Sequence, residues 1–180
     1  MEICKLDIEG LLLFRPEVFK DNRGHFFESW SKLTFNNLGL DFDFVQDNQS
    51  LSSKGVLRGL HFQKPPFAQG KLVSVIRGSV LDVAVDIRKS SPTYGQYVAV
   101  ELSDSNNISF WIPPGFAHGF VALKDNTIFS YKCSEVYNKE SEGSIIWNDK
   151  DLNIDWGVEC PIVSEKDLEA ETFKNLITQF

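Results

Sequence analysis

The chain has 180 residues, 42% of them hydrophobic and 24% charged, and this size and composition suit one globular domain with a substantial core. Its formal net charge of −7 argues against non-specific binding to nucleic acids, because that binding depends on a basic surface that neutralises phosphates. The first residues lack the basic segment and apolar stretch of a secretory signal, and no run reaches the ~18 apolar residues of a membrane span, so neither secretion nor membrane insertion is expected.

The first predicted element is a helix over residues 28–38. In this segment Trp30, Leu33 and Leu38 fall near one face of a helix, and Gly39 is placed to end it. Beyond about residue 40 the apolar residues alternate with polar ones, and this period is typical of strands.

Alternating polarity predicts the central part of the fold. In residues 81–87, apolar residues at the odd positions alternate with polar or small residues, which indicates a half-buried strand. Residues 72–76 form another predicted strand, joined to the first as a hairpin through a turn at 77–79. Further strands are predicted at residues 97–102, 108–112, 120–123 and 128–133. Many short strands in succession indicate an all-β sandwich, barrel or jelly roll.

A second helix is predicted over residues 164–177. Ser164 is its expected N-cap, and Asp167 follows three residues later, in the position of a capping box. Its inner stripe would consist of Leu168, Thr172 and Leu176. We therefore expect a single domain over residues 1–180, with a β core at about 40–150 to which an N-terminal arm and this helix are attached.

The cysteines are few and widely separated in the sequence. They are Cys4, Cys133 and Cys160, and no C-x-x-C pair is present. Neither a disulfide framework nor a thiolate zinc site is therefore expected. A reducing, cytoplasmic environment is the simplest expectation for such a chain.

The histidines raise the question of a metal site. Residues 113–118, PPGFAH, resemble the second half of the cupin signature, P-x-G-x-x-H, whose histidine (here His118) binds a metal in other cupins. The first half would require H-x-H, but only His61 stands there, and the third histidine of the chain is His25. A first-row metal needs about three or four converging ligands. We therefore expect the cupin-like jelly roll (double-stranded β-helix), with short peripheral helices, without the metal.

Basic side chains gather around His61. Arg58, His61 and Lys71 lie in or beside strands rich in apolar residues, where an unpaired cation is costly, so they suggest an anionic ligand or a carboxylate network. Ordinary surface-facing strand positions remain the alternative for Arg58 and Lys71. Arg58 and His61 would face opposite sides of a regular strand. A shared pocket therefore requires a bulge, and Gly59 is its natural place, so irregular pairing is predicted there.

Several blocks of the sequence, in the same order, resemble the dTDP-4-dehydrorhamnose 3,5-epimerase family of cupin-like sugar-nucleotide epimerases. The blocks are residues 23–28, 44–48, 56–63, 69–73, 82–88, 111–120 and 142–149. The most specific among them are RGLHFQ, at 58–63, and the P-x-G-x-A-H-G-F pattern, at 113–120. The resemblance covers nearly the whole chain.

The resemblance implies a homodimer that needs no metal or other cofactor. It also implies the substrate dTDP-4-dehydro-6-deoxy-D-glucose, a dTDP-4-keto-6-deoxy sugar. Epimerisation at C3 and C5 would give dTDP-4-dehydro-L-rhamnose, on the pathway to dTDP-L-rhamnose. No nucleic acid or membrane partner is implied.

The same resemblance implies roles for individual residues. His61 matches the family's catalytic base, Tyr131 its proton donor and Asp167 the carboxylate that pairs with the histidine. Lys71 is the best candidate to stabilise the oxyanion of the enolate, as a cation in a partly dry pocket. The substrate-binding positions are Arg23, Glu28, Gln46, Asn48, Arg58, Lys71, His118, Tyr137, Glu142 and Lys166.

Several of these side chains also have a purely structural interpretation. Asp167 suits helix capping, Tyr131 shares a strand face with Phe129 as a core tyrosine would, and His118 suits a buried structural histidine. One departure from the family is Val136, which stands where the family often has a tyrosine.

Three other functions stay open from the sequence. The first is a mono-epimerase that inverts only C3 or only C5 of a related dTDP-4-keto sugar. The second is a metal-dependent cupin enzyme, such as a dioxygenase or isomerase. The third is a non-catalytic module that binds a sugar nucleotide, although such a module needs no base, carboxylate and tyrosine together.

Overall fold

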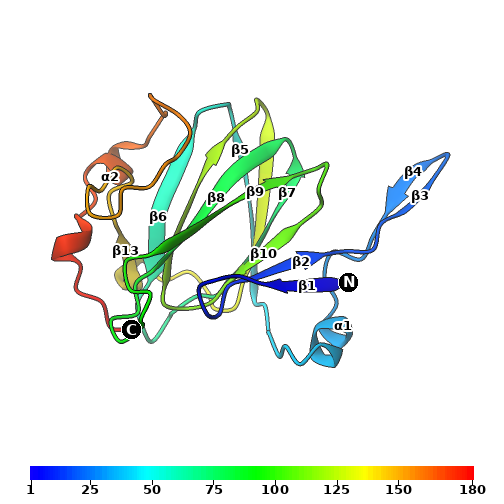
Figure 1. The fold of residues 1–180 in the computed structure, drawn as a ribbon, viewed down its shortest axis with the longest axis horizontal. Helices are drawn as coiled ribbons and strands as arrows, with labels where there is room; N and C mark the ends of the chain where they lie inside the picture. Colours follow the sequence, from blue (N-terminus) through cyan, green and yellow to red (C-terminus); the bar gives the residue numbers. More distant parts are fainter.

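Two antiparallel β-sheets face each other in the computed structural model, which describes residues 1–180, and together they form a cupin-like jelly roll (Figure 1). The six-stranded sheet consists, in spatial order, of β1 (Glu2–Lys5), β2 (Leu12–Arg15), β10 (Ser109–Ile112), β7 (Lys71–Arg77), β12 (Thr127–Cys133) and β5 (Gln46–Ser52). The five-stranded sheet consists of β13 (Glu142–Ser144), β6 (Leu57–Gln63), β11 (Phe116–Ala122), β8 (Ser79–Asp86) and β9 (Tyr97–Ser103). The all-β prediction is confirmed.

The N-terminal segment is more closely integrated than the expected arm. Strands β1 and β2 belong to the six-stranded sheet, because β2 pairs with β10 and β1 pairs with β2. Beyond them a two-stranded hairpin of β3 (Phe19–Asp21) and β4 (Gly24–Phe26) projects away from both sheets (Figure 1). No helix in the structure has the length and apolar character needed to cross a membrane.

Side chains from the inner faces of the two sheets form the main core. The aromatic rings of Phe110, Phe120 and Phe129 are almost completely buried in this core, together with aliphatic residues such as Val73 of β7 and Val80 of β8. Stacked Phe120 and Phe129 join the two sheets, with ring centroids 4.1 Å apart. Burial of this apolar surface is the main stabilising contribution to the fold.

Strand β8 is buried on both faces, so the prediction of a half-buried strand is wrong. Its predicted apolar face, with Val83 and Val85, points outward and packs under the C-terminal segment against Leu152 and Trp156. The polar face, with Asp82, points into the interior. The strand does alternate with a period of two, but the C-terminal segment supplies a third layer that no local pattern reveals.

The predicted hairpin between residues 72–76 and 81–87 is also wrong. Strands β7 and β8 belong to different sheets, and the chain crosses from one sheet to the other at Gly78. Gly78 has φ 86°, and a Cβ at this position would lie 2.4 Å from Oγ1 of Thr127. Only glycine suits such a tight, left-handed connection.

Both helices are shorter than predicted. Helix α1 spans Lys32–Asn37 and ends at Gly39 as expected, but it buries Phe35, whereas Leu33 on the predicted face is 70% exposed. Helix α2 spans only Glu165–Leu168. Two short 3₁₀ turns complete the helical elements, η1 (Lys139–Ser141) and η2 (Phe173–Asn175).

The long C-terminal helix fails for a physical reason. Ser164 caps α2 as predicted, since its hydroxyl accepts the N–H of Asp167. After one turn, however, the chain pairs with the residues that directly follow β13: the carbonyl of Glu171 accepts the N–H of Ile146. A short isolated helix is marginal, so this long-range pairing prevails. Leu168, expected on the inner stripe, is 54% exposed.

A buried carboxylate fixes the loop that follows β8. Asp86 is fully buried and accepts hydrogen bonds from Arg88, Ser91 and Thr93. Burial alone would raise the pKa of Asp86, but these hydrogen bonds lower it to about 2. The ionised carboxylate therefore stabilises the folded state above pH ~4, and the stabilisation is lost as the pH falls toward ~2.

We predict that Asp86→Asn lowers the free energy of unfolding by about 2 kcal/mol near pH 7, because the shift of the pKa corresponds to roughly that amount. The difference from the unmodified protein should shrink as the pH falls from about 4 to about 2. Urea unfolding at a series of pH values measures it. A difference that is constant over this range would contradict the role given to the charge.

Candidate functional site

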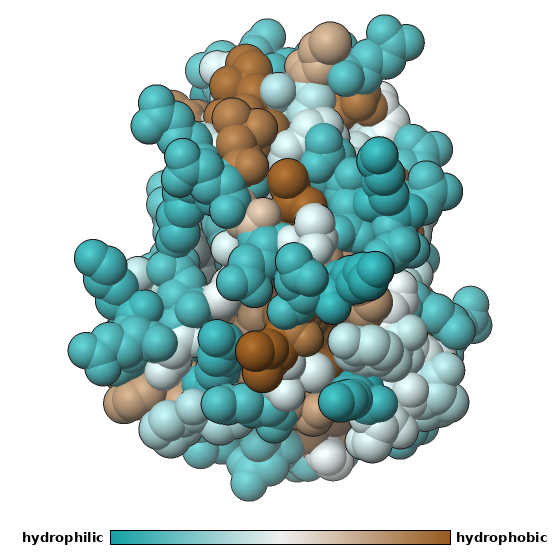
Figure 2. Space-filling model, turned by 90° about the vertical axis from the view of Figure 1, so that its left-hand side faces the viewer, coloured by the Kyte–Doolittle hydropathy of each residue, from teal (hydrophilic) through white to brown (hydrophobic).

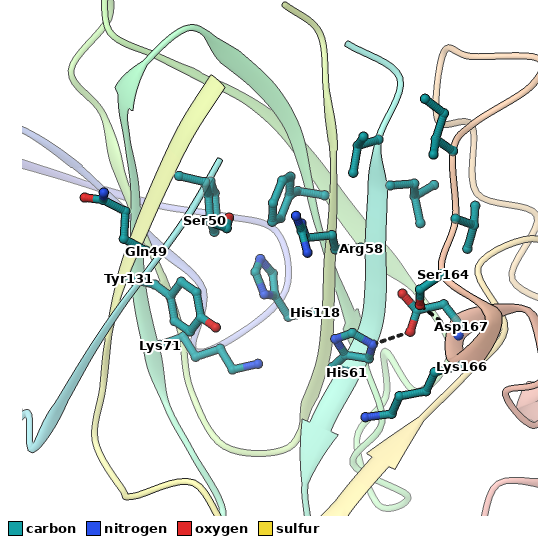
Figure 3. Close-up of a pocket in the computed structure, with 16 residues that line it drawn as sticks. Gln49, Ser50, Arg58, His61, Lys71, His118, Tyr131, Ser164, Lys166 and Asp167 are labelled. Carbon is teal, nitrogen blue, oxygen red and sulfur yellow. Dashed lines mark hydrogen bonds and ion pairs between the residues drawn. The ribbon is translucent and has the colours of Figure 1, made fainter. Parts of the chain in front are cut away.

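A cavity of about 490 Å³ lies between the two sheets, at the edge where the C-terminal segment packs against β6. It adjoins a smaller hollow of about 280 Å³, and both are lined by His61, Lys71 and Tyr131, so the two form one site. The larger cavity is lined by Gln49, Ser50, Val56, Leu57, Arg58, His61, Lys71, His118, Phe120, Phe129, Tyr131, Ile162, Val163, Ser164, Lys166 and Asp167. Figure 3 shows these side chains around the cavity.

A bulge in β6 brings Arg58 and His61 to the same cavity. His61 lies opposite His118 of β11, and Arg58 lies opposite Phe120, so β6 carries one residue more than its partner strand between these points. Gly59 lies within this irregularity and has φ 130°. The predicted irregular pairing is therefore confirmed. Arg58 donates hydrogen bonds to Oγ of Ser52 and to the carbonyl of Leu51, and has no acidic partner.

His61 and Asp167 are joined by a short hydrogen bond. Nε2 of His61 lies 2.6 Å from Oδ1 of Asp167, so the C-terminal segment does return to β6. The carboxylate is almost completely buried, and its second oxygen accepts the N–H of Gly59 at 3.4 Å. Burial alone would raise the pKa of Asp167, but the hydrogen bonds from His61, Gly59 and Ser164 lower it below its usual range. The residue is therefore an anion that orients the imidazole.

Tyr131 and Lys71 face this pair from the opposite sheet. They project from β12 and β7, and their polar ends point across the cavity toward His61 and His118 (Figure 3). Burial raises the pKa of Tyr131, so its phenol stays protonated at neutral pH. Burial lowers the pKa of Lys71, although nearby acidic groups oppose this effect. No ion pair of the structure involves Lys71.

His118 forms a second buried pair, with Asp82. Nε2 of His118 lies 3.0 Å from each carboxylate oxygen of Asp82, which is fully buried. Burial lowers the pKa of His118 despite the neighbouring carboxylate. Asp82 was not predicted, because its strand pattern reads the same whether the polar face points inward or outward. No group of three or more His, Cys, Asp or Glu side chains in the chain is arranged to hold a metal.

Polar side chains at the rim of the smaller hollow bond to one another. Lys166 forms an ion pair with Glu142 at 2.6 Å, and Glu142 also accepts the hydroxyl of Tyr137 at 3.1 Å. Gln46 donates to Asn48 and accepts the N–H of Tyr137. Four of these five expected binding residues line the smaller hollow, and the fifth, Lys166, lines the larger cavity and joins them through Glu142.

Arg23 and Glu28 lie outside the cavity in this chain. Arg23 is on the projecting β3–β4 hairpin, exposed to solvent and paired with Asp21. Glu28 accepts the hydroxyl of Thr34, at the base of α1. The remaining expected site residues are together, whereas these two are brought to no cavity shared with His61.

Comparison with known proteins gives consistent matches over nearly the full chain. Residues 5–175 match the family model described as dTDP-4-dehydrorhamnose 3,5-epimerase. The chain is 51% identical to the dTDP-4-dehydrorhamnose 3,5-epimerase of Shigella flexneri, and the match covers 96% of each chain.

Solved structures agree with these matches. The dTDP-6-deoxy-D-glucose-3,5-epimerase of Legionella pneumophila, in complex with dTDP-4-keto-L-rhamnose, is 48% identical, with a TM-score of 0.93 and coverage of 98% of this chain and 94% of that one. A more distant match is ChmJ, a 3'-monoepimerase from Streptomyces bikiniensis in complex with dTDP-quinovose. It is 34% identical, with a TM-score of 0.88 and coverage of 93% and 85%.

We predict that Gly59→Ala disrupts the contact between β6 and β11. A Cβ at Gly59 would lie 2.5 Å from Cα of Gly119, and φ is positive, so the two strands must separate and His61 must shift. We expect a loss of unfolding free energy of at least about 2 kcal/mol, with faster amide exchange in both strands.

Gly55→Ala is the matched control. Gly55 also has a positive φ, of 83°, but a Cβ there would meet no atom within 4 Å. It should therefore cost only about 1 kcal/mol and leave amide exchange in β11 unchanged. Equal effects of the two substitutions would show that the close approach at Gly59 has no special weight.

Proposed function

The chain belongs to the dTDP-4-dehydrorhamnose 3,5-epimerase family, and on this premise we propose that it converts dTDP-4-dehydro-6-deoxy-D-glucose to dTDP-4-dehydro-L-rhamnose, in the biosynthesis of dTDP-L-rhamnose. The observation that carries the proposal is the His61–Asp167 hydrogen bond on one wall of a cavity whose opposite wall holds Tyr131. Membership of an epimerase family favours this function over the two alternatives of a metal-dependent cupin enzyme and a non-catalytic binding module.

The substrate's C3 and C5 hydrogens both flank the C4 ketone, so loss of either proton gives an enolate. His61 is the proposed base. Because Nε2 is held by the Asp167 carboxylate, Nδ1 is the nitrogen free to take the proton. Asp167 fixes this tautomer and stabilises the imidazolium that forms, as a carboxylate does behind other catalytic histidines.

Tyr131 is the proposed acid. It lies on the other sheet, and it keeps its proton because burial raises its pKa. Delivery of this proton to the face opposite His61 inverts the carbon. Lys71 would stabilise the enolate oxygen. The charge of an oxyanion favours the protonated amine and so opposes the effect of burial on the Lys71 pKa.

Inversion at both carbons is favoured over inversion at one. The Shigella flexneri and Legionella pneumophila proteins, both named as 3,5-epimerases, share about half of the residues of this chain. The mono-epimerase ChmJ shares 34%. Its similar fold means that the fold alone does not decide how many carbons are inverted.

Deuterium exchange tests the assignment. In deuterated buffer, His61→Ala should lose exchange at both C3 and C5 by at least about 10³-fold, because the base is removed. Tyr131→Phe should retain exchange better than net inversion, because the base still removes protons but the opposite face lacks a donor. NMR of the dTDP-4-keto sugar follows both carbons separately.

Two outcomes would contradict these roles. Exchange at either carbon that survives in His61→Ala would assign that carbon to a different base. Equal loss of exchange and inversion in Tyr131→Phe would remove the separation of base and acid onto two faces.

A product inverted at one carbon only in the unmodified enzyme would favour mono-epimerisation.

We further propose that the enzyme is a homodimer in which the β3–β4 hairpin of one protomer completes the site of its partner. Arg23 lies in the turn of this hairpin, outside its own cavity, and its guanidinium suits a diphosphate. Phe19 and Phe26, on the same hairpin, are 57% and 71% exposed, which is unusual for phenylalanine without a partner surface. A reducing cytoplasm suits the three unpaired cysteines.

Mixing two inactive variants tests the dimer. Arg23→Ala and His61→Ala should each be impaired, but a heterodimer contains one site with both residues intact. Random subunit exchange should therefore restore about a quarter of the unmodified activity. No recovery in verified heterodimers, or a monomer in analytical ultracentrifugation, would contradict the proposal.

A further inference from the structure

The segment of residues 162–173, here termed the strap, carries Asp167 and forms one wall of the cavity. At its first end, Ile162 donates its N–H to Gly55 and accepts the N–H of Leu57, at 2.8 and 2.9 Å. The inner side of the strap reaches the cavity through Val163, Ser164 and Lys166, among others. Figure 2 shows the side of the molecule that carries it as mostly hydrophilic, with scattered apolar side chains.

The second end of the strap is held by a buried carboxylate, Asp149. Its Oδ2 accepts the N–H of Phe173 at 2.8 Å, and its Oδ1 accepts the N–H groups of Asp151 and Leu152 at 2.9 and 3.1 Å. Asp149 is 5% exposed and forms no ion pair, so main-chain donors alone satisfy it. Such hydrogen bonds to a charged acceptor are among the stronger ones in proteins.

The two oxygens of Asp149 therefore do different things. Oδ1 closes the local turn at residues 149–152, and Oδ2 binds the main chain of the strap at Phe173, 24 positions later in the sequence. The ring of Phe173 adds a second contact, because it packs on Tyr94 with centroids 5.0 Å apart. Between these ends the strap is also held at Glu171, whose carbonyl accepts the N–H of Ile146 at 2.8 Å. Helix α2 itself is a single helical turn, which has little stability of its own.

We propose that Asp149 is a positioning residue for the reaction, acting through the strap on Asp167 and thus on His61. The inference rests on the proposed epimerase function. A base and its carboxylate must be held within about 0.5 Å of the productive geometry. Asp149 does not touch the cavity, but it fixes the chain six positions after Asp167 and limits how far α2 can move from β6.

Asp149→Asn is the informative substitution, because it keeps the size of the side chain. An amide oxygen can still accept the N–H groups of Asp151 and Leu152, while the amide nitrogen then faces the N–H of Phe173, donor against donor. We expect kcat for proton exchange to fall about tenfold, equivalent to about 1.4 kcal/mol, with little change in KM.

A double-mutant cycle with Asp167→Asn distinguishes positioning from simple loss of stability. If Asp149 acts through Asp167, then Asp149→Asn should reduce exchange by less than about twofold when Asp167 is already replaced. An equal tenfold loss in both backgrounds would overturn the proposal, since it would mean a general structural effect. Unchanged exchange in the single variant would overturn it as well.

Asp104→Asn is the matched control. Asp104 also accepts a main-chain N–H, from Gly78 at 2.8 Å, but at the crossing between the sheets and away from the strap. Asp104 is exposed and accepts one main-chain N–H where Asp149 accepts three, so Asp104→Asn should cost less thermal stability and leave exchange unchanged. An equal loss of exchange would count against a special role for Asp149. Absence of epimerisation in the unmodified enzyme would instead refute the proposed function, so the two failures are distinct.

Discussion

The hydrogen bond between His61 and Asp167 is the interaction on which the site depends. It joins residues 106 positions apart, one in the five-stranded sheet and one in the C-terminal segment. A buried carboxylate without a partner would be strongly unfavourable, so this contact also gives the C-terminal segment a reason to lie where it does. The same contact therefore orients the histidine and adds to the apolar packing of Leu152 and Trp156 that holds the third layer over β8.

The titratable side chains of the cavity suit a ligand that develops negative charge during the reaction. Burial lowers the pKa values of Lys71 and His118 and raises that of Tyr131, so burial disfavours the charged form of all three groups. Asp82 and Asp167 each pair with a histidine, Asp167 on the cavity wall itself and Asp82 beneath it. An anion that forms inside meets donors already in place, which need no reorganisation at that moment.

The sequence was most informative where function required a local irregularity. Arg58 and His61 are separated by an odd number of positions, and this parity, with Gly59 between them, was enough to predict the bulge. The strands were also predictable, because a period of two is a local property. Lys71 and Tyr131 could be named from the family resemblance, and their strands do meet at the cavity.

The predictions that proved wrong concern features that depend on contacts between residues distant in the sequence. Strands β7 and β8 are adjacent in sequence, and nothing in either pattern says that Gly78 sends them to different sheets. The capping signal at Ser164 marks where a helix begins, but its end is set by pairing of Glu171 with Ile146. Asp82 escaped notice because its face turns inward to His118, while a layer formed more than 60 residues later covers the opposite, apolar face with Val83 and Val85.

Because His61 and Tyr131 stand on different sheets, the gap between them is set by the thickness of the hydrophobic layer beneath, where Phe120 stacks on Phe129. The core thus works as a spacer, and a sugar ring must fit the width it leaves. Variation in core volume between relatives would alter proton-transfer distances without touching a polar residue. Adaptation of such an enzyme to heat or cold should accordingly be sought in these phenylalanines, because a substitution there changes the stability of the fold and the rate of proton transfer together.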